Sequence, residues 1–217
     1  MDQGASHMDG ATRSAISPGT RKGERTKRRI VDATMELLGE RSFGQLKITE
    51  ITRRAEVVQP TFYTYFSSIE EVVLEAAREA STDCLAHHFE SDWIGPEGLA
   101  RARAFVKDSI RVWDSHKLIH NLTMLLADQG IVEFQRERIR QSRPMVKGLE
   151  YQVKRSQAAG LLPEQLNARL VAYEALSILI GLGSRPQLFR DSGFTDEQLV
   201  DTTARLLLLC VTGSPGD

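Results

Sequence analysis

The chain of 217 residues is poor in the features that mark several common protein classes. It has only two cysteines, Cys84 and Cys210, which lie far apart in the sequence and give no disulfide framework. Its longest apolar run, Leu206–Val211, is far shorter than the ~20 residues that cross a bilayer. The polar first residues contain no signal-peptide core. These absences predict a cytoplasmic protein that makes no membrane contact.

Proline is also scarce, with seven residues, and no evenly spaced turn signals mark a ladder of strands. Leu, Ala, Arg and Glu dominate instead, and these residues favour helices. Apolar residues recur at helical spacing along most of the chain, so we expect an all-α fold. The predicted helices cover residues 24–41, 48–55, 59–66, 69–91, 96–115, 116–128, 131–159, 164–182 and 196–211, and Pro144 is expected to kink or divide the seventh.

Recognisable catalytic and cofactor motifs are missing as well. The chain has no Gly-rich phosphate loop and no Ser or Cys in a recognisable nucleophile setting. His116 and His120 have the i, i+4 spacing of metal ligands, but Lys117 stands where a zincin would carry its glutamate. We therefore predict no enzyme, no cofactor and no bound metal. A metal- or redox-sensing regulator that uses its histidines or cysteines, and a small all-α enzyme, remain open as alternatives.

The net charge of −1 hides an uneven distribution along the chain. Residues 21–66 contain ten Lys/Arg and six Asp/Glu, whereas residues 71–217 contain 17 basic and 20 acidic residues. The positive segment opens with RKGERTKRR, Arg21–Arg29. Such a run is either a solvated tail or an arm that binds phosphates. The candidate phosphate contacts are Arg25, Lys27, Arg28 and Arg29.

The segment AEVVQPTFYTYF, residues 55–66, places four aromatic rings within five positions. It forms the second of two predicted short helices, which are joined by about three residues and follow a longer helix. That pattern predicts a helix-turn-helix, whose second helix lies in the major groove of DNA. Phe62 and Phe66 are four residues apart and can both point inward, whereas Tyr63 cannot share their face. An aromatic-rich core turn is the alternative, but the neighbouring basic run favours DNA binding.

The stretch ITEITRRAEVVQPTFYTYFSSIEEVV resembles the DNA-binding segment of the TetR family of bacterial transcriptional repressors, over roughly Thr26–Leu74. The resemblance implies a three-helix helix-turn-helix domain over residues 21–68 and a helical ligand-sensing and dimerisation domain over residues 69–213. Residues 1–20 read as a disordered tail, in which GASHM looks like the remnant of an expression tag. Three positions depart from the pattern, where many members carry Gly, Ser and Lys and this chain carries Glu56, Val58 and Ile69.

The resemblance also assigns roles within this segment. Residues implied to face the operator in the major groove are Gln59, Pro60, Thr61 and Tyr63, with Thr49 as a further operator contact. Residues implied to touch phosphates are Thr61, Thr64 and Tyr65. Glutamine can pair with adenine edges, and hydroxyl groups suit both phosphates and bases, so the chemistry of these side chains agrees with the assignment.

The last two predicted helices carry more apolar surface than one core face needs. A helix that is hydrophobic all round is buried all round, which predicts a homodimer with a twofold four-helix interface. A monomer whose own core absorbs this surface is the alternative. The candidate interface residues are Leu176, Ile178, Leu179, Leu182, Thr203, Leu206, Leu207 and Cys210.

Large or adaptable side chains on the middle helices suggest a pocket for a mostly apolar small molecule. A methionine or aromatic stripe can equally be ordinary core. The candidate pocket residues are Trp113, His116, His120, Met124, Phe134, Met145 and Tyr151. Together these features predict a dimeric repressor that binds a palindromic operator in double-stranded DNA and is released by its small-molecule effector.

Overall fold

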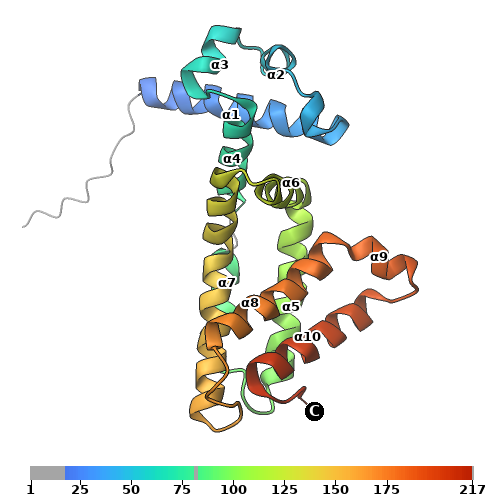
Figure 1. Ribbon diagram of the computed structural model, residues 1–217. Coiled ribbons are helices and arrows are strands. Elements are labelled where there is room, and N and C mark those ends of the chain that lie inside the picture. The colour runs from blue at the N-terminus through green and yellow to red at the C-terminus, as the bar shows by residue number, and fades with distance from the viewer. Residues whose placement is uncertain (1–17, 81–82, 217) are drawn as a thin grey trace, which may run out of the picture. The chain divides into compact units, whose positions relative to one another are not determined.

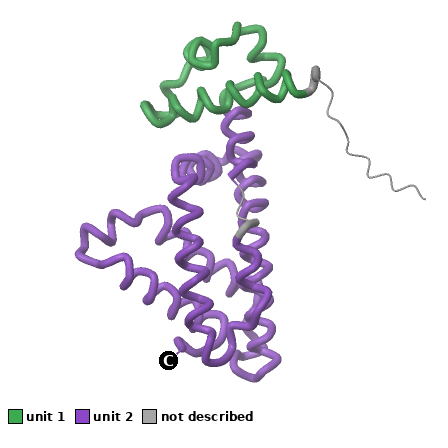
Figure 2. Tube along the Cα trace, turned by 180° about the vertical axis from the view of Figure 1, so that it is seen from behind, with its two compact units in different colours: residues 1–69 green, residues 70–217 purple. Residues whose placement is uncertain are grey.

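The computed structural model describes residues 18–80 and 83–216. The chain divides into two compact units, residues 1–69 and residues 70–217, which Figure 2 shows in different colours. We refer to their described parts as the first unit and the second unit. Every regular element of the described residues is a helix, so the predicted all-α fold is confirmed. None of the described helices is long and apolar enough to cross a membrane.

The first unit is a long helix followed by two short ones. α1 spans Pro18–Glu40, a 3-10 turn covers Phe43–Gln45, α2 spans Ile48–Arg54 and α3 spans Gln59–Tyr65. α1 therefore begins six residues before the predicted start, and the last three residues of the predicted disordered tail belong to it. The rest of that tail lies outside the described residues. Ile30, Ile51 and Phe62 are fully buried and form the centre of this small core.

The second unit begins with α4, which spans Ile69–Glu79, starts at the unit boundary and ends before the predicted residue 91. A 3-10 helix covers Asp83–Phe89, and the remaining helices are α5 (Gly98–Ser115), α6 (Lys117–Asp128), α7 (Val132–Ala158), α8 (Ala168–Ser184), α9 (Pro186–Asp191) and α10 (Asp196–Thr212). α9 was not predicted.

Local sequence signals fix the ends of the two C-terminal long helices. The Asn167 side chain caps α8 by accepting from the backbone N–H groups of Arg169 and Leu170. Thr195 and Gln198 form a capping box at the start of α10, and Gly213, with φ of 78°, ends it in the left-handed conformation. α7 continues through Pro144 without dividing, contrary to one of the two expected outcomes.

The core of the second unit lies where α5, α7, α8 and α10 pack together (Figure 1). Trp93, Phe105 and Leu207 are buried at its centre. The buried amide of Gln152 on α7 accepts from the Trp93 backbone N–H at 2.8 Å and donates to the Ser91 carbonyl at 3.0 Å. This pairing fastens the segment before α5 to α7, and so fixes the helices that surround the pocket described below.

Candidate functional site

The short helix α3 separates its aromatic side chains between two faces. Phe62 and Phe66 are buried, with ring centroids 6.0 Å apart, whereas Tyr63 is 53% exposed. Pro60 lies in the first turn of α3, where a missing N–H does no harm. The exposed face carries Gln59, Pro60, Tyr63 and Thr64, and Thr61 is half-buried at its edge. α3 therefore presents polar and aromatic groups that the core of the first unit does not use.

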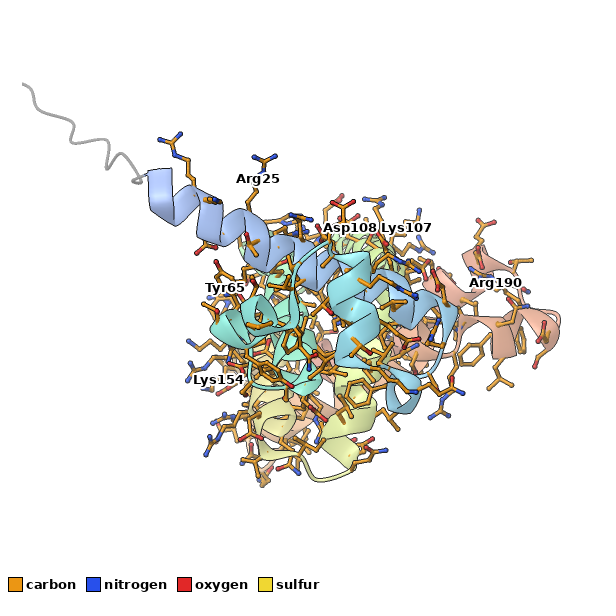
Figure 3. The ribbon with its side chains drawn as sticks, turned by 90° about the horizontal axis from the view of Figure 1, so that it is seen from above. Arg25, Tyr65, Lys107, Asp108, Lys154 and Arg190 are labelled. Atoms are coloured by element: carbon orange, nitrogen blue, oxygen red, sulfur yellow. The ribbon has the colours of Figure 1, made fainter. Side chains whose placement is uncertain are left out.

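Two hydroxyl groups of α3 have partners or neighbours within the first unit. The Thr64 Oγ1 donates to the Pro60 carbonyl at 3.2 Å, so its hydroxyl lies along the helix. Tyr65 is half-buried, and its Oη lies over α1, because a Cβ atom added at Gly23 would be 3.5 Å from it. Figure 3 labels Tyr65 and Arg25, which belong to these two elements. The Tyr65 hydroxyl thus lies beside the basic segment rather than among the groove-facing side chains.

The basic run is helical, since α1 begins at Pro18, and its four candidate phosphate contacts differ in their surroundings. Arg25 is exposed, and Figure 3 shows its side chain pointing away from the helix. The Lys27 ammonium lies 5.9 Å from the centroid of the Phe66 ring. Arg28 pairs with Asp32 at 2.9 Å within α1. The predicted first helix, residues 24–41, already contained these four cations, and α1 presents them in a fixed helical pattern.

Arg29 supports the turn between α2 and α3. Glu56 has a φ of 51°, a left-handed conformation that costs a non-glycine residue about 1 kcal/mol. The Arg29 guanidinium donates to both the Glu56 carbonyl and the Glu56 carboxylate, each at 3.1 Å. The Val57 N–H donates to the Thr52 carbonyl at 2.9 Å and closes the turn. The chain thus holds an unfavourable turn residue with a cation that sequence reasoning had assigned only to DNA.

α2 adds a second polar face. The predicted contact Thr49 is exposed, and Arg53, one turn later on the same helix, is exposed too. Lys47 is exposed immediately before α2. Neither Lys47 nor Arg53 was predicted as a site residue, although the excess of basic residues over the segment was the available signal. By contrast, Arg54 pairs with Glu36 and Glu40 and ties α2 to α1.

The second unit contains a mostly apolar pocket between α5, α6, α7 and α8. Its volume is about 70 Å³. Trp113, His120, Met124 and Met145 line it, as the sequence suggested. The other wall residues are Leu85, Ser109, Ile110, Val112, Thr123, Arg138, Gln141, Ser142, Leu176, Leu179, Ile180, Leu182 and Gly183.

Three of the predicted pocket residues lie elsewhere. His116 is exposed at the start of α6, Phe134 is buried in the core, and Tyr151 is 48% exposed on α7. The 3.6-residue period explains the error. The sequence shows which helices carry large side chains, but the packing of α7 decides which of its faces meets the pocket.

The centre of the pocket wall is an indole stacked on an imidazole. The Trp113 and His120 rings are 5.0 Å apart between centroids, with 29° between their planes. Burial, helped by the charge of His116, lowers the pKa of His120 from 6.5 to about 4. His120 is therefore neutral at physiological pH. Behind the indole lies Gly183, where an added Cβ would come within 2.7 Å of Trp113 Cδ2.

Most of the predicted interface residues are buried within the protomer. They number five, and three of them also line the pocket; the five are Leu176, Leu179, Leu182, Thr203 and Leu207. Ile178 and Cys210 are half-buried, and Leu206 is 45% exposed. The large apolar residues that α8 and α10 expose are Leu170, Tyr173, Leu206 and Leu209, of which only Leu206 was among the predicted interface residues.

The rings of His116 and His120, which have the i, i+4 spacing, lie 6.0 Å apart between centroids. Within the described residues, the group that could supply three metal ligands is His87, His88 and Asp108, whose ligand atoms lie within 4.8 Å of one another. His88 Nε2 is 3.0 Å from Asp108 Oδ2, and Arg111 Nη1 donates to Asp108 Oδ1 at 2.7 Å. Burial lowers the pKa of His88. Both carboxylate oxygens of Asp108 are thus engaged by neighbouring side chains.

The cysteines give little support to a redox sensor. Cys210 is a free thiol, and burial raises its pKa, which disfavours the reactive thiolate. The side chain of Cys84 lies outside the described ones.

Comparisons with known proteins agree with this arrangement. Residues 30–76 match the family described as bacterial regulatory proteins, tetR family. An HTH-type transcriptional regulator of Haemophilus influenzae is 40% identical over 58 residues, which are 26% of this chain and 28% of that protein. The chain thus matches little more than a quarter of the length of this relative.

Solved structures share the fold over nearly the whole chain. The fatty acid degradation regulator FadR of Bacillus halodurans gives a TM-score of 0.62 at 17% identity, covering 90% of this chain and 97% of that one. Bacillus subtilis FadR, solved in complex with stearoyl-CoA, gives 0.61 at 17% identity, covering 86% and 98%. Residues 85–216, more than half of the chain, match the tetracyclin repressor-like C-terminal domain. The protein therefore belongs to the TetR family of bacterial regulatory proteins.

Proposed function

We propose that the protein is a homodimeric repressor that reads a palindromic operator through α3 and leaves it when a mostly apolar effector enters the pocket. The observation that carries the DNA-binding part is the division of α3 into two faces. Phe62 and Phe66 complete the core, whereas Gln59 is exposed and Tyr63, whose ring touches Phe62 edge-on at 5.6 Å between centroids, remains 53% exposed. The exposed Tyr63 ring and the Gln59 amide can make contacts with base edges and phosphates, which a recognition helix requires and which ordinary exposure to solvent does not explain.

The phosphate contacts belong to the elements around α3. Arg25 on α1 and Lys47 and Arg53 beside or on α2 are exposed cations that make no side-chain ion pair within the described part of the chain. Each such cation that meets a phosphate releases counterions and steepens the salt dependence of binding. Arg29, which holds the Glu56 turn, acts mainly through the geometry of α3.

The proposed dimer contact is the outward face of α8 and α10. Leu170 and Tyr173 on α8 and Leu206 and Leu209 on α10 are large apolar residues that the protomer leaves exposed. Burial of four such side chains against a second copy would stabilise the dimer by several kcal/mol, at roughly 1.5–3 kcal/mol per fully buried side chain.

The proposed effector site is the pocket beside Trp113. Its wall is almost wholly aliphatic and aromatic, which suits an apolar molecule. The stearoyl-CoA complex of Bacillus subtilis FadR supports ligand binding by a protein of this architecture, although 17% identity carries no information about which ligand this chain takes.

The test of DNA reading starts from operators selected by the wild-type protein from a pool of random duplexes. Tyr63→Ala and Gln59→Ala should each weaken binding by about 1–3 kcal/mol without lowering the melting temperature. Tyr151→Ala is the matched control, because Tyr151 is about equally exposed but lies on α7. If Tyr63→Ala binds the selected operator as tightly as Tyr151→Ala does, α3 is not the reading helix.

A further inference from the structure

Three polar atoms on the pocket wall have no hydrogen-bond partner among the residues that the structure describes. They are Trp113 Nε1, His120 Nε2 and Thr123 Oγ1. The Gln141 side chain lies near enough to His120 to oppose the fall in its pKa, but no hydrogen bond of acceptable geometry joins it to His120 Nε2. His120 and Thr123 are only 5% and 2% exposed, so water reaches these groups poorly. A buried polar atom that stays unpaired costs about 1–3 kcal/mol, and folded proteins carry few of them. Three in one small pocket indicate a wall that a polar group of another molecule completes.

The three atoms lie in one place. His120 and Thr123 are three residues apart on α6 and therefore share a helix face, and the Trp113 indole stacks on the His120 ring. The other polar side chains of the wall are already engaged. Ser109 Oγ donates to the Phe105 carbonyl at 2.7 Å, and Gln141 Nε2 donates to the Ala77 carbonyl at 2.6 Å.

The charge of the wall narrows the chemistry of the ligand. His120 is neutral, as its lowered pKa requires, and Arg138, the one formally charged side chain among the described residues of the wall, pairs with Asp128 at 2.7 Å. A carboxylate placed against the neutral imidazole would lose its hydration without gaining an unpaired cation, which is strongly unfavourable. The aliphatic remainder of the wall suits a hydrocarbon body.

We propose that the effector is an uncharged, mostly apolar molecule with one hydrogen-bonding oxygen, a carbonyl or a hydroxyl, that meets Trp113, His120 and Thr123. This inference rests on the proposed effector role of the pocket. The indole N–H can only donate, so the ligand atom that faces Trp113 must accept. A carbonyl oxygen does so, and a hydroxyl oxygen can accept from Trp113 while it donates to His120 Nε2 or Thr123 Oγ1.

A matched set of three small probes tests the ligand class on the purified full chain, without DNA. Acetophenone carries the carbonyl, ethylbenzene lacks it, and benzoate replaces it with a charge. Binding is measured by calorimetry and by the quenching of tryptophan fluorescence. We expect acetophenone to bind at least about tenfold more tightly than either of the others, which corresponds to one good hydrogen bond. Equal binding of acetophenone and ethylbenzene, preference for benzoate, or no binding of acetophenone up to its solubility limit would overturn the proposal.

Variants assign the effect to the named atoms. His120→Phe and Thr123→Val should each reduce the preference for acetophenone over ethylbenzene to less than about threefold while ethylbenzene binds as before. Ser109→Ala is the matched control, because Ser109 lines the same pocket but its hydroxyl is already bonded to the Phe105 carbonyl. An unchanged preference in both His120→Phe and Thr123→Val would refute the assignment of these atoms.

A separate readout distinguishes the inference from the proposed function. The same ketone is added to the protein bound to its selected operator. If acetophenone binds with the expected preference but leaves operator affinity unchanged, the ligand chemistry stands and the effector role of the pocket fails. If operator affinity responds to benzoate as strongly as to acetophenone, the effector role stands and the proposed ligand class fails.

Discussion

The neutral His120 should make the stability of the second unit depend on pH in a defined direction. Its pKa is about 4 in the folded chain, against an ordinary value of 6.5. Between these two values the unfolded chain binds more protons than the folded one, so the free energy of unfolding falls as pH drops below about 6.5. The loss ends near pH 4, where the folded state is protonated too.

The expected size follows from the two pKa values. At about pH 5 the unfolded histidine is almost fully protonated and the folded one almost fully neutral, which removes about 2 kcal/mol relative to about pH 7.5. Asp196 and Asp201 have lowered pKa values, because hydrogen bonds from arginines hold them charged. They titrate below the chosen window. His88, also with a lowered pKa, contributes in the same direction as His120, so the measurement must be a difference between variants.

The assay is urea unfolding followed by tryptophan fluorescence, since both tryptophans, Trp93 and Trp113, belong to the second unit. Between about pH 7.5 and about pH 5 the wild-type chain should lose about 2 kcal/mol more than His120→Gln does. His116→Gln is the matched control, because His116 is exposed on the same helix and its removal should leave the loss nearly unchanged. Equal losses in the wild type and in His120→Gln would refute the buried neutral histidine.

Three further predictions concern the dimer face, the turn between α2 and α3, and the pocket. Leu206→Glu should give stable monomers by light scattering. Leu207→Ala, at a fully buried neighbouring position, should keep the dimer but lower the free energy of unfolding by about 2–5 kcal/mol. An unchanged dimer in Leu206→Glu would rule out this face as the interface. Arg29→Ala should speed amide hydrogen exchange over the α2–α3 turn. The effect should be smaller in a Glu56→Gly background, where a φ of 51° costs nothing. Equal effects in both backgrounds would contradict the stabilisation of the Glu56 turn by Arg29. Gly183→Ala should push the Trp113 indole into the pocket and weaken acetophenone binding at least about tenfold, and normal binding would show that the indole has room to move.

The sequence predicted the helix bounds well where apolar residues recur at helical spacing and a residue that ends helices follows them. α2, α3 and α10 end within a residue of the expected positions, because short apolar stripes are bounded by polar or glycine residues there. The start of α1 was harder, since RKGERTKRR carries no apolar stripe to reveal a helix. The left-handed turn at Glu56 was expected from the resemblance, but its partner Arg29, 27 residues away, could not be inferred from spacing.

The errors at the pocket and at the dimer face have one physical origin. A helix that is apolar all round offers no sequence signal for which stripe faces its own core and which faces a partner. Of the four α8 residues chosen for the interface, Leu176, Leu179 and Leu182 belong to the inner stripe and Ile178 is half-buried, whereas the exposed Leu170 and Tyr173 were not chosen. Only the packing of α8 against α5, α7 and α10 decides between them.

That division of α8 into two stripes bears on how an effector could act on DNA binding. Leu176, Leu179 and Gly183 of α8 belong to the pocket wall, and Gly183 lies directly against the Trp113 indole. A ligand larger than the present pocket must move the indole or the helix behind it, since close-packed interiors transmit displacement rather than absorb it. The outer stripe of the same helix carries the proposed dimer contact. A ligand that displaces α8 would therefore move its outer stripe as well, which makes Gly183 the first pocket position to substitute.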